Sequence, residues 1–279
     1  MAKQIGKHLP AHERFKNVQR GEQLPFWPSE VRCAPNEFLR SALFNARNRN
    51  QPRRYLNDVV LAMLGKGRIT YRGEELRQDD ATVWLQLVKF AAEIPLGEYV
   101  EFTPHAFCKA VGWTPTGDAY AHLRKCLSRL QATSLSFYAE RTRVTISLSM
   151  IPEFSWQDLG TGKPLPRYKV KLAGQLAELF KGHHYTYVTW SQRNRLPEGL
   201  ATWLHGYFSS HREPFPLKFA DIQRVADLTI QRPDNLRTAI VRALTALVEV
   251  GLLESWKIVD ERITVIRRPY QGVVSENGK

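Results

Sequence analysis

The amino-acid sequence predicts an α+β protein of two tandem winged helix-turn-helix domains, preceded by a flexible basic N-terminal tail. The first observation behind this prediction is length, because 279 residues are nearly twice the roughly 150 residues of an average domain. The second is a repeated order of patterns, in which a strand, two amphipathic helices and an alternating hairpin occur in each half of the chain. The third is the N-terminus, where lysines and arginines are interrupted by prolines and no apolar periodicity is present.

These patterns divide the chain into four segments. We predict a flexible tail over residues 1–30, a first winged-helix domain over 31–158, a second winged-helix domain over 165–268 and a disordered C-terminal tail over 269–279.

The first domain is expected to begin with a helix. Its apolar residues recur at helical spacing after Asn36, a good N-cap residue, and they are Phe38, Leu39, Ala42, Leu43 and Ala46. A basic loop over 47–54 and a short strand over 69–72 follow. A long helix then begins near Asp79 and Asp80. We interpret these aspartates as first-turn charges that the helix dipole favours by roughly 0.3–1 kcal/mol each, rather than as metal or acid–base groups.

The part of the first domain that is predicted to contact DNA follows this helix along the chain. A strand over 99–102, a helix over 104–111 and a recognition helix over 118–133 are followed by a hairpin of strands 135–139 and 144–148, interpreted as the wing. The outer face of the recognition helix and the wing tip are basic and are predicted to contact DNA through His122, Arg124, Lys125, Arg129, Arg141 and Arg143.

The second domain repeats this order. A strand over 168–172, helices over 198–208 and 217–228, a recognition helix over 233–250 and a hairpin of 252–259 with 262–267 are expected. The predicted DNA contacts lie on the outer helix face and on the wing, and they are Asn235, Arg237, Thr238, Arg242, Lys257 and Arg262.

Charge and composition narrow the function classes. The formal net charge of +13 and the pI near 9.8 favour a nucleic-acid partner. Three distant cysteines form no CxxC pair, and no apolar stretch reaches the roughly 18 residues of a membrane span. The GTGK run at 160–163 lacks P-loop spacing, and the adjacent His183 and His184 would point to opposite sides of a strand. We therefore expect no enzyme activity, no cofactor, no metal site and no membrane association.

Four longer strings resemble a known family. Residues 40–44 (RSALF), 69–77 (ITYRGEELR), 126–133 (CLSRLQAT) and 207–214 (YFSSHREP) are similar to the TrfA family of plasmid replication initiators. The resemblance extends from about Gln23 to Arg268. It implies a bacterial cytoplasmic protein that binds repeated duplex sites, called iterons, at a plasmid origin and helps to melt adjacent AT-rich DNA, with single-stranded AT-rich DNA as a further ligand. It also implies recruitment of the host initiator DnaA, the DnaB helicase and the sliding clamp, and a monomer–homodimer equilibrium.

A short segment before the first domain resembles a clamp-binding peptide. Gln23, Leu24, Phe26 and Trp27 lie in the run QLPFW, which is similar to the QLxLF peptide. An extended segment with adjacent large apolar side chains can fill a hydrophobic groove on a partner. The alternative is that Phe26 and Trp27 attach the tail to the first domain.

The sequence thus predicts an origin-binding plasmid replication initiator. A winged-helix transcriptional repressor is the first alternative, because the same helices would serve both functions. A DNA nickase or primase is the second, although no ligand cluster supports it.

Overall fold

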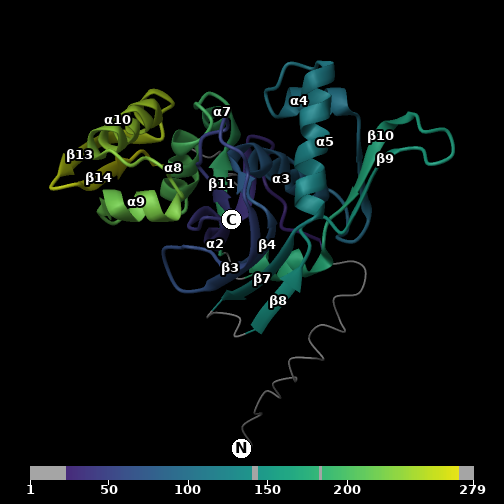
Figure 1. Cartoon of the computed structure of the whole chain (residues 1–279), viewed down its shortest axis with the longest axis horizontal. Helices are drawn as coiled ribbons and strands as arrows, with labels where there is room; N and C mark the ends of the chain where they lie inside the picture. Colours follow the sequence, from purple (N-terminus) through teal and green to yellow (C-terminus); the bar gives the residue numbers. More distant parts are fainter. Residues whose placement is uncertain (1–22, 140–143, 182–183, 270–279) are drawn as a thin grey trace, which may run out of the picture.

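The computed structural model describes residues 23–139, 144–181 and 184–269 and has a mixed architecture of helices and strands (Figure 1). In chain order the elements are β1 (Val31–Pro35), α2 (Asn36–Leu39), β2 (Phe44–Asn45), β3 (Tyr55–Val60), β4 (Arg68–Glu74), β5 (Leu76–Arg77), α3 (Gln78–Ala91), β6 (Tyr99–Phe102), α4 (Pro104–Ala110), α5 (Gly117–Gln131), β7 (Ser134–Ala139), β8 (Val144–Leu148), β9 (Glu153–Gln157), β10 (Pro164–Lys171), η1 (Gly174–Leu176), α6 (Ala177–Phe180), β11 (Tyr185–Thr189), α7 (Trp190–Arg193), α8 (Leu200–Ser209), β12 (Leu217–Lys218), α9 (Phe219–Val225), α10 (Pro233–Glu249), β13 (Leu253–Val259) and β14 (Arg262–Arg267). Within these residues no helix is long and apolar enough to cross a membrane.

Helix α3 lies at the centre of the first part of the molecule. Its sequence lacks glycine and proline, and at its N-terminus the Asp80 carboxylate accepts the backbone N–H of Arg77 at 2.9 Å. Almost all of the helix is buried, and Trp84 lies against the rings of Phe38 and Phe44 at centroid distances of 5.4 and 5.9 Å. Because it contacts β1, β2, β5, β6 and α5, α3 forms the centre of the larger core.

An antiparallel sheet with the order β3-β4-β7-β8 forms part of that core. Side chains of β7 alternate, so that Leu135 and Phe137 are fully buried while Ser136 shares a hydrogen bond with Ser147 at 2.8 Å on the other face. This sheet corrects one prediction. The hairpin predicted as the first wing exists, but it belongs to this sheet and not to the helix-turn-helix beside it.

The same local topology occurs twice. Strand β6, helices α4 and α5 and hairpin β9–β10 form a unit whose sheet has the order β6-β10-β9. Strand β12, helices α9 and α10 and hairpin β13–β14 repeat it with the order β12-β14-β13. In each unit the first strand pairs with the last, which fixes the hairpin next to the two helices. Figure 1 shows the two hairpins at opposite ends of the molecule.

The hydrophobic cores place the boundary between the two parts later than predicted. The first core extends from Leu24 to Trp190, and the second is built from residues 196–265 together with Ala46. Residues 164–190 belong to the first part because β10 pairs with β6 and β11 pairs with β1. The predicted domain limits of 158 and 165 are therefore wrong, since strand pairing over long sequence distances decides where the chain folds back.

Two local predictions also need correction. The helix expected after Asn36 ends at Leu39, and Phe44 and Asn45 form a short strand parallel to β5. Here Leu43, Phe44, Asn45 and Ala46 are all buried, which suits a strand enclosed on both sides better than an amphipathic helix. The predicted tail ends earlier than residue 30, because Leu24 and Trp27 are part of the first core.

Candidate nucleic-acid interface

Helix α10 presents one apolar face and one polar face. Pro233 occupies its first turn, and Asp234 adds a negative charge near the positive end of the helix dipole. Leu236, Ile240, Leu244 and Leu247 are buried at intervals of three and four residues, so they anchor the helix to the second core.

The opposite face of α10 carries the predicted DNA contacts. Asn235, Arg237, Thr238 and Arg242 are all exposed. Among the described residues neither Arg237 nor Arg242 has an ion-pair partner, so both guanidinium groups are available to a ligand. The Thr238 hydroxyl donates to the Asp234 carbonyl at 2.8 Å, which leaves its oxygen free to accept a hydrogen bond and its methyl group exposed.

Hairpin β13–β14 places two further cations near this helix. Lys257 and Arg262 are both exposed, as predicted for residues that meet phosphates. Arg262 lies opposite Lys218 on β12, a cation that the sequence analysis did not single out. The turn between the strands is made by Asp260 and Glu261 in left-handed conformations with φ of 47° and 57°. Because these two residues are acidic, phosphate contact suits the strands better than the tip.

Helix α5 is the corresponding helix of the first unit, and only part of its predicted basic face is free. Lys125 is exposed, as expected. Arg124 is half-buried, because its guanidinium lies 5.2 Å from the Trp156 ring centroid and donates to the Tyr168 hydroxyl at 3.1 Å. His122 lies against the Trp113 ring at 4.9 Å, and its Nε2 is 3.4 Å from Asp79. These contacts join α5 to the β9–β10 hairpin and to α3.

Arg129 is a correction to the predicted interface. Its side chain is only 11% exposed, and its Nε donates to Asp80 Oδ1 at 2.9 Å. Arg53 completes the cluster by binding Asp79 and Asp80 at 2.7 and 2.6 Å. Removing one partner of a buried ion pair leaves an uncompensated charge, at a cost of roughly 3–5 kcal/mol. Arg129 therefore holds α5 on α3, and its charge is already paired within the protein.

The paired aspartates thus do more than the sequence analysis assigned to them. Asp80 caps α3, as interpreted, but both carboxylates also neutralise buried arginines. Burial and the neighbouring charge of Asp79 raise the pKa of Asp80 to about 6. Asp79, His122 and Cys126 lie close enough to share a ligand. However, the Asp79 oxygens already accept from Arg53 and Arg129, and burial raises the pKa of the Cys126 thiol well above its usual range. This donor set does not suit a metal ion.

The segment that resembles a clamp-binding peptide is attached to the first core. Trp27 is fully buried and stacks on Phe180, with ring centroids 6.1 Å apart. Lys89 donates to the Trp27 carbonyl at 3.0 Å, and Gln23 donates to the carbonyl of Ala92 at 3.2 Å. Leu24 is buried as well, whereas Phe26 is 80% exposed. Leu24 and Trp27 are therefore not free anchors in this conformation. The alternative that Phe26 and Trp27 attach the tail to the first domain agrees with the burial of Trp27 but not with the exposure of Phe26.

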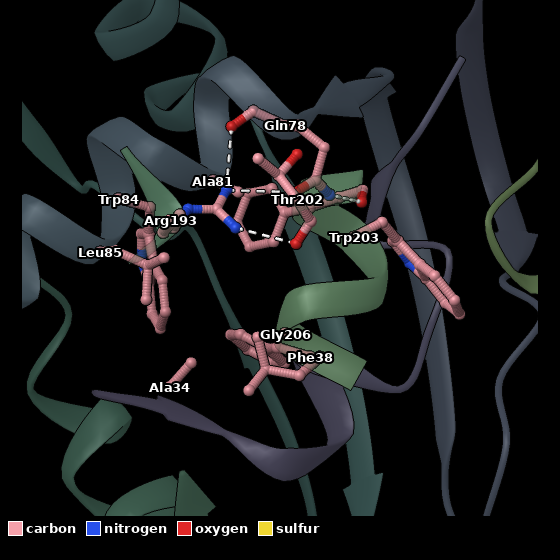
Figure 2. Close-up of a pocket in the computed structure, with 12 residues that line it drawn as sticks. Ala34, Phe38, Gln78, Ala81, Trp84, Leu85, Arg193, Thr202, Trp203 and Gly206 are labelled. Carbon is pink, nitrogen blue, oxygen red and sulfur yellow. Dashed lines mark hydrogen bonds between the residues drawn. The ribbon is translucent and has the colours of Figure 1, made fainter. Parts of the chain in front are cut away.

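The junction between the two parts is closed around Arg193. Figure 2 shows its guanidinium between Gln78 of α3 and Thr202 of α8, with hydrogen bonds of 3.1 Å to the Gln78 side chain and 3.1 Å to the Thr202 carbonyl. Burial lowers the pKa of Arg193 to about 10. The adjoining cavity is about 20 Å³, which holds little more than one water molecule. This pocket is a structural junction rather than a ligand site.

The predicted contacts Arg141 and Arg143 lie outside the described residues.

Comparison with known proteins assigns the family. The sequence model described as TrfA protein matches residues 2–267, which is almost the whole chain. The chain belongs to the TrfA family. A curated relative, the plasmid replication initiator protein TrfA of Escherichia coli, is 36% identical over 239 residues. The match covers 85% of this chain and 62% of the relative, so the chain spans less than two thirds of that protein's length.

Two solved structures share the fold of this TrfA-family chain. A selenomethionine crystal structure of domains 2 and 3 of RctB has a TM-score of 0.55 at 13% identity, covering 84% of this chain and 98% of that one. A second crystal structure of RctB domains 2–3 has a TM-score of 0.52 at 12% identity and covers 80% of this chain and 95% of that one. At these identities the likeness establishes the architecture and nothing further.

The structure also shows a basic hairpin of this TrfA-family chain that the sequence did not predict. Strands β9 and β10 form the hairpin of the first unit, and Lys163 is exposed in the loop between them. Arg167 and Lys169 point to the same face of β10 and both pair with Glu101 of β6. Alternation of basic and apolar residues over 167–172 is a signal for this strand, but nothing in the sequence shows that β6 is its partner.

Proposed function

We propose that this chain is a plasmid replication initiator that binds repeated duplex sites at an origin and catalyses no reaction itself. The family assignment supports the proposal, because the matched relative is an initiator. The observation that carries it is the unpaired cationic face of α10, which lies opposite a fully buried apolar stripe.

Each of the two repeated units is, in this proposal, a winged helix. The order of strand, two helices and hairpin, with the first strand paired to the last, supports this for both units. A helix such as α10 fits the roughly 12 Å major groove, where Arg237 can make a bidentate contact to guanine. Lys257 and Arg262 would meet the adjoining phosphates. In the first unit, Lys125 on α5 and Lys163 on the hairpin are the corresponding exposed cations.

Further steps of initiation belong to the same proposal. They comprise opening of AT-rich DNA, recruitment of DnaA, the DnaB helicase and the sliding clamp, and exchange between monomer and dimer. For the clamp, the exposed Phe26 ring is the side chain of the 23–27 segment that can reach a partner without unfolding.

Footprinting across the origin of the plasmid that carries the gene tests the proposal. We expect protection of several direct repeats beside an AT-rich tract, and loss of that protection in the Arg237→Ala/Arg242→Ala double variant. Incubation of supercoiled origin plasmid with the protein and magnesium should leave it uncut. Protection of a promoter alone, with no repeats, would instead indicate a repressor, and a nicked product would indicate an enzyme.

A further inference from the structure

The second unit is nearly neutral, although it carries α10. Residues 196–268 contain 10 lysines and arginines against 9 aspartates and glutamates. Residues 23–195 contain 24 against 15, so most of the positive charge outside the termini lies in the first part. Affinity for DNA depends on how many phosphates are neutralised. Cations of the first part that lie beside α10 would therefore add phosphate contacts that the second unit lacks.

The loop over residues 46–54 lies against the turn that leads into α10. The backbone N–H of Ala46 donates to the Ala226 carbonyl at 2.8 Å, and the Thr229 hydroxyl donates to the Gln51 side chain at 3.0 Å. Arg54 forms an ion pair with Asp227. These three contacts attach the loop to the segment between α9 and α10.

The tip of the loop is pre-organised. Gln51 N–H donates to the Asn48 carbonyl at 3.0 Å, which closes a four-residue turn with Arg49 and Asn50 at its centre. The Asn48 side chain accepts the Asn50 N–H at 2.9 Å. Below the turn, the buried guanidinium of Arg77 donates to the carbonyls of Asn48 and Gln51 at 2.8 and 3.0 Å. The turn is held from within the protein, so that binding would cost little ordering of this segment.

Arg49 is the free charge of this turn. Its side chain is exposed and forms no hydrogen bond or ion pair within 4 Å among the described residues. Burial raises the pKa of Glu198, and the positive charge of Arg49 partly opposes that rise. Pro233 at the start of α10 lies only four positions after Thr229, which contacts the turn. Four residues span at most about 14 Å, comparable with the roughly 12 Å width of the major groove.

We propose that the turn Asn48–Gln51 is a second phosphate-binding element, contacting the duplex backbone beside the groove that α10 enters, with Arg49 as its cation. This inference rests on the proposed function and specifies where the first part of the chain meets the same DNA. The contact reads no base, so it adds affinity equally on every duplex.

Fluorescence anisotropy with the full chain tests the inference. The probes are a labelled duplex containing the footprinted repeat and an unrelated duplex of equal length, each titrated between 50 and 200 mM salt. For Arg49→Ala we expect the slope of log affinity against log salt to become shallower by about 0.9 on both duplexes. Between 50 and 200 mM salt, the affinity of the variant should therefore fall about 3.5-fold less than that of the wild type. Arg49→Lys should retain the wild-type slope, because a phosphate contact of this kind requires only a positive charge.

Arg68→Ala is the matched control. Arg68 is also exposed and has no ion-pair partner among the described residues. It begins β4, whose other end lies next to the loop through the pairing of Glu74 with Tyr55. Six residues of strand place it roughly 20 Å from that end. Its loss should leave the slope unchanged, and thermal unfolding should show that both variants are folded.

The outcomes separate the two proposals. A steep wild-type slope that Arg49→Ala leaves unchanged overturns the inference, and so does an equal change in Arg68→Ala, which would reflect net charge alone. A wild-type protein that binds both duplexes equally contradicts the proposed function instead.

Discussion

Two arginines that were both predicted to contact DNA, Arg129 and Arg237, have opposite environments in the folded chain. The sequence places Arg129 and Arg237 alike on the outer face of a recognition helix. In the structure Arg129 is largely covered and paired with Asp79 and Asp80, whereas Arg237 is exposed and has no ion-pair partner among the described residues. The difference arises because α5 packs on α3, whose acidic first turn lies within reach, while no acidic side chain of the second core meets Arg237.

Arg237 is expected to read sequence. An arginine on the outer face of α10 can bind guanine with a discrimination of roughly 1–3 kcal/mol. Arg237→Ala should therefore lose more affinity for the repeats than for unrelated DNA, by about 5-fold to 150-fold. Lys257→Ala and Arg262→Ala should weaken binding to both DNAs about equally, because phosphate contacts carry no sequence information. Equal losses at Arg237 on the two probes would show that α10 is not the reading helix.

His205 is expected to make stability depend on pH. Burial on α8, together with the charges of Arg193 and Arg267, lowers its pKa to about 3, against about 6.5 in an unfolded chain. The folded state thus keeps this imidazole neutral. The contribution of the neutral imidazole to stability is fully present above pH 6.5 and is lost as the pH falls towards 3. The expected slope is about 1.4 kcal/mol per pH unit in that range.

Urea unfolding of the wild type and His205→Gln at pH 7 and pH 5 measures this effect. Between pH 7 and pH 5, the free energy of unfolding of the wild type should fall by about 2 kcal/mol more than that of the variant. The reason is that 1.5 pH units of this interval lie below the unfolded-state pKa of about 6.5. Parallel losses in the two proteins would assign the pH dependence to other groups.

At the scale of elements, most helices and several strands could be predicted from the sequence, because their signals are local. Helix α10 starts at Pro233 as predicted, and α4 starts at Pro104 after the Thr103 cap. The first hairpin shows where local signals end. Strands β7 and β8 follow α5 directly and look like a wing, yet β4 takes β7 as its partner, and β9–β10 pairs with β6. That choice depends on contacts between residues dozens of positions apart.

The candidate site was predictable to a similar extent. The exposed face of α10 follows from helical periodicity alone, so Asn235, Arg237 and Arg242 could be placed correctly. The burial of Trp27 could be stated only as an alternative, because its partner Phe180 is more than 150 residues away and the run QLPFW suits either environment. The same holds for Lys218, which becomes a neighbour of Arg262 only through strand pairing.

The extended segment from Gln23 to Trp27 gives a prediction at this scale. Trp27→Ala should lower stability by about 3–5 kcal/mol, because a fully buried indole and its stacking on Phe180 are lost. Phe26→Ala should cost at most about 1 kcal/mol, since the ring is exposed and contacts Lys89 by a cation–π interaction.

Thermal unfolding and clamp binding, measured on the same two variants, decide what the segment does. Loss of clamp binding in Phe26→Ala with unchanged stability would support recruitment through the exposed ring. Clamp binding that survives in Phe26→Ala would assign the segment to folding alone.

At the scale of the whole molecule, the two parts are joined by charged and polar contacts rather than by a flexible linker. Arg40 binds Ser210, Arg193 binds Gln78 and Thr202, and Arg54 binds Asp227. Because these contacts fix α10 relative to the more basic first part, the positive charge of both parts can act on one duplex.

Binding to origin DNA should therefore depend steeply on salt. The net charge of +13 is concentrated in the first part and the termini, while in the proposed function α10 supplies the groups that read bases. If about six to ten phosphates are neutralised, affinity should fall by on the order of 10³–10⁵ between 50 and 200 mM salt. The decrease should be as steep on unrelated duplex as on the repeats, because released counterions and not base contacts cause it. Anisotropy titrations at four salt concentrations measure the slope, and a nearly flat response on both probes would contradict DNA binding through the cations identified in the two parts.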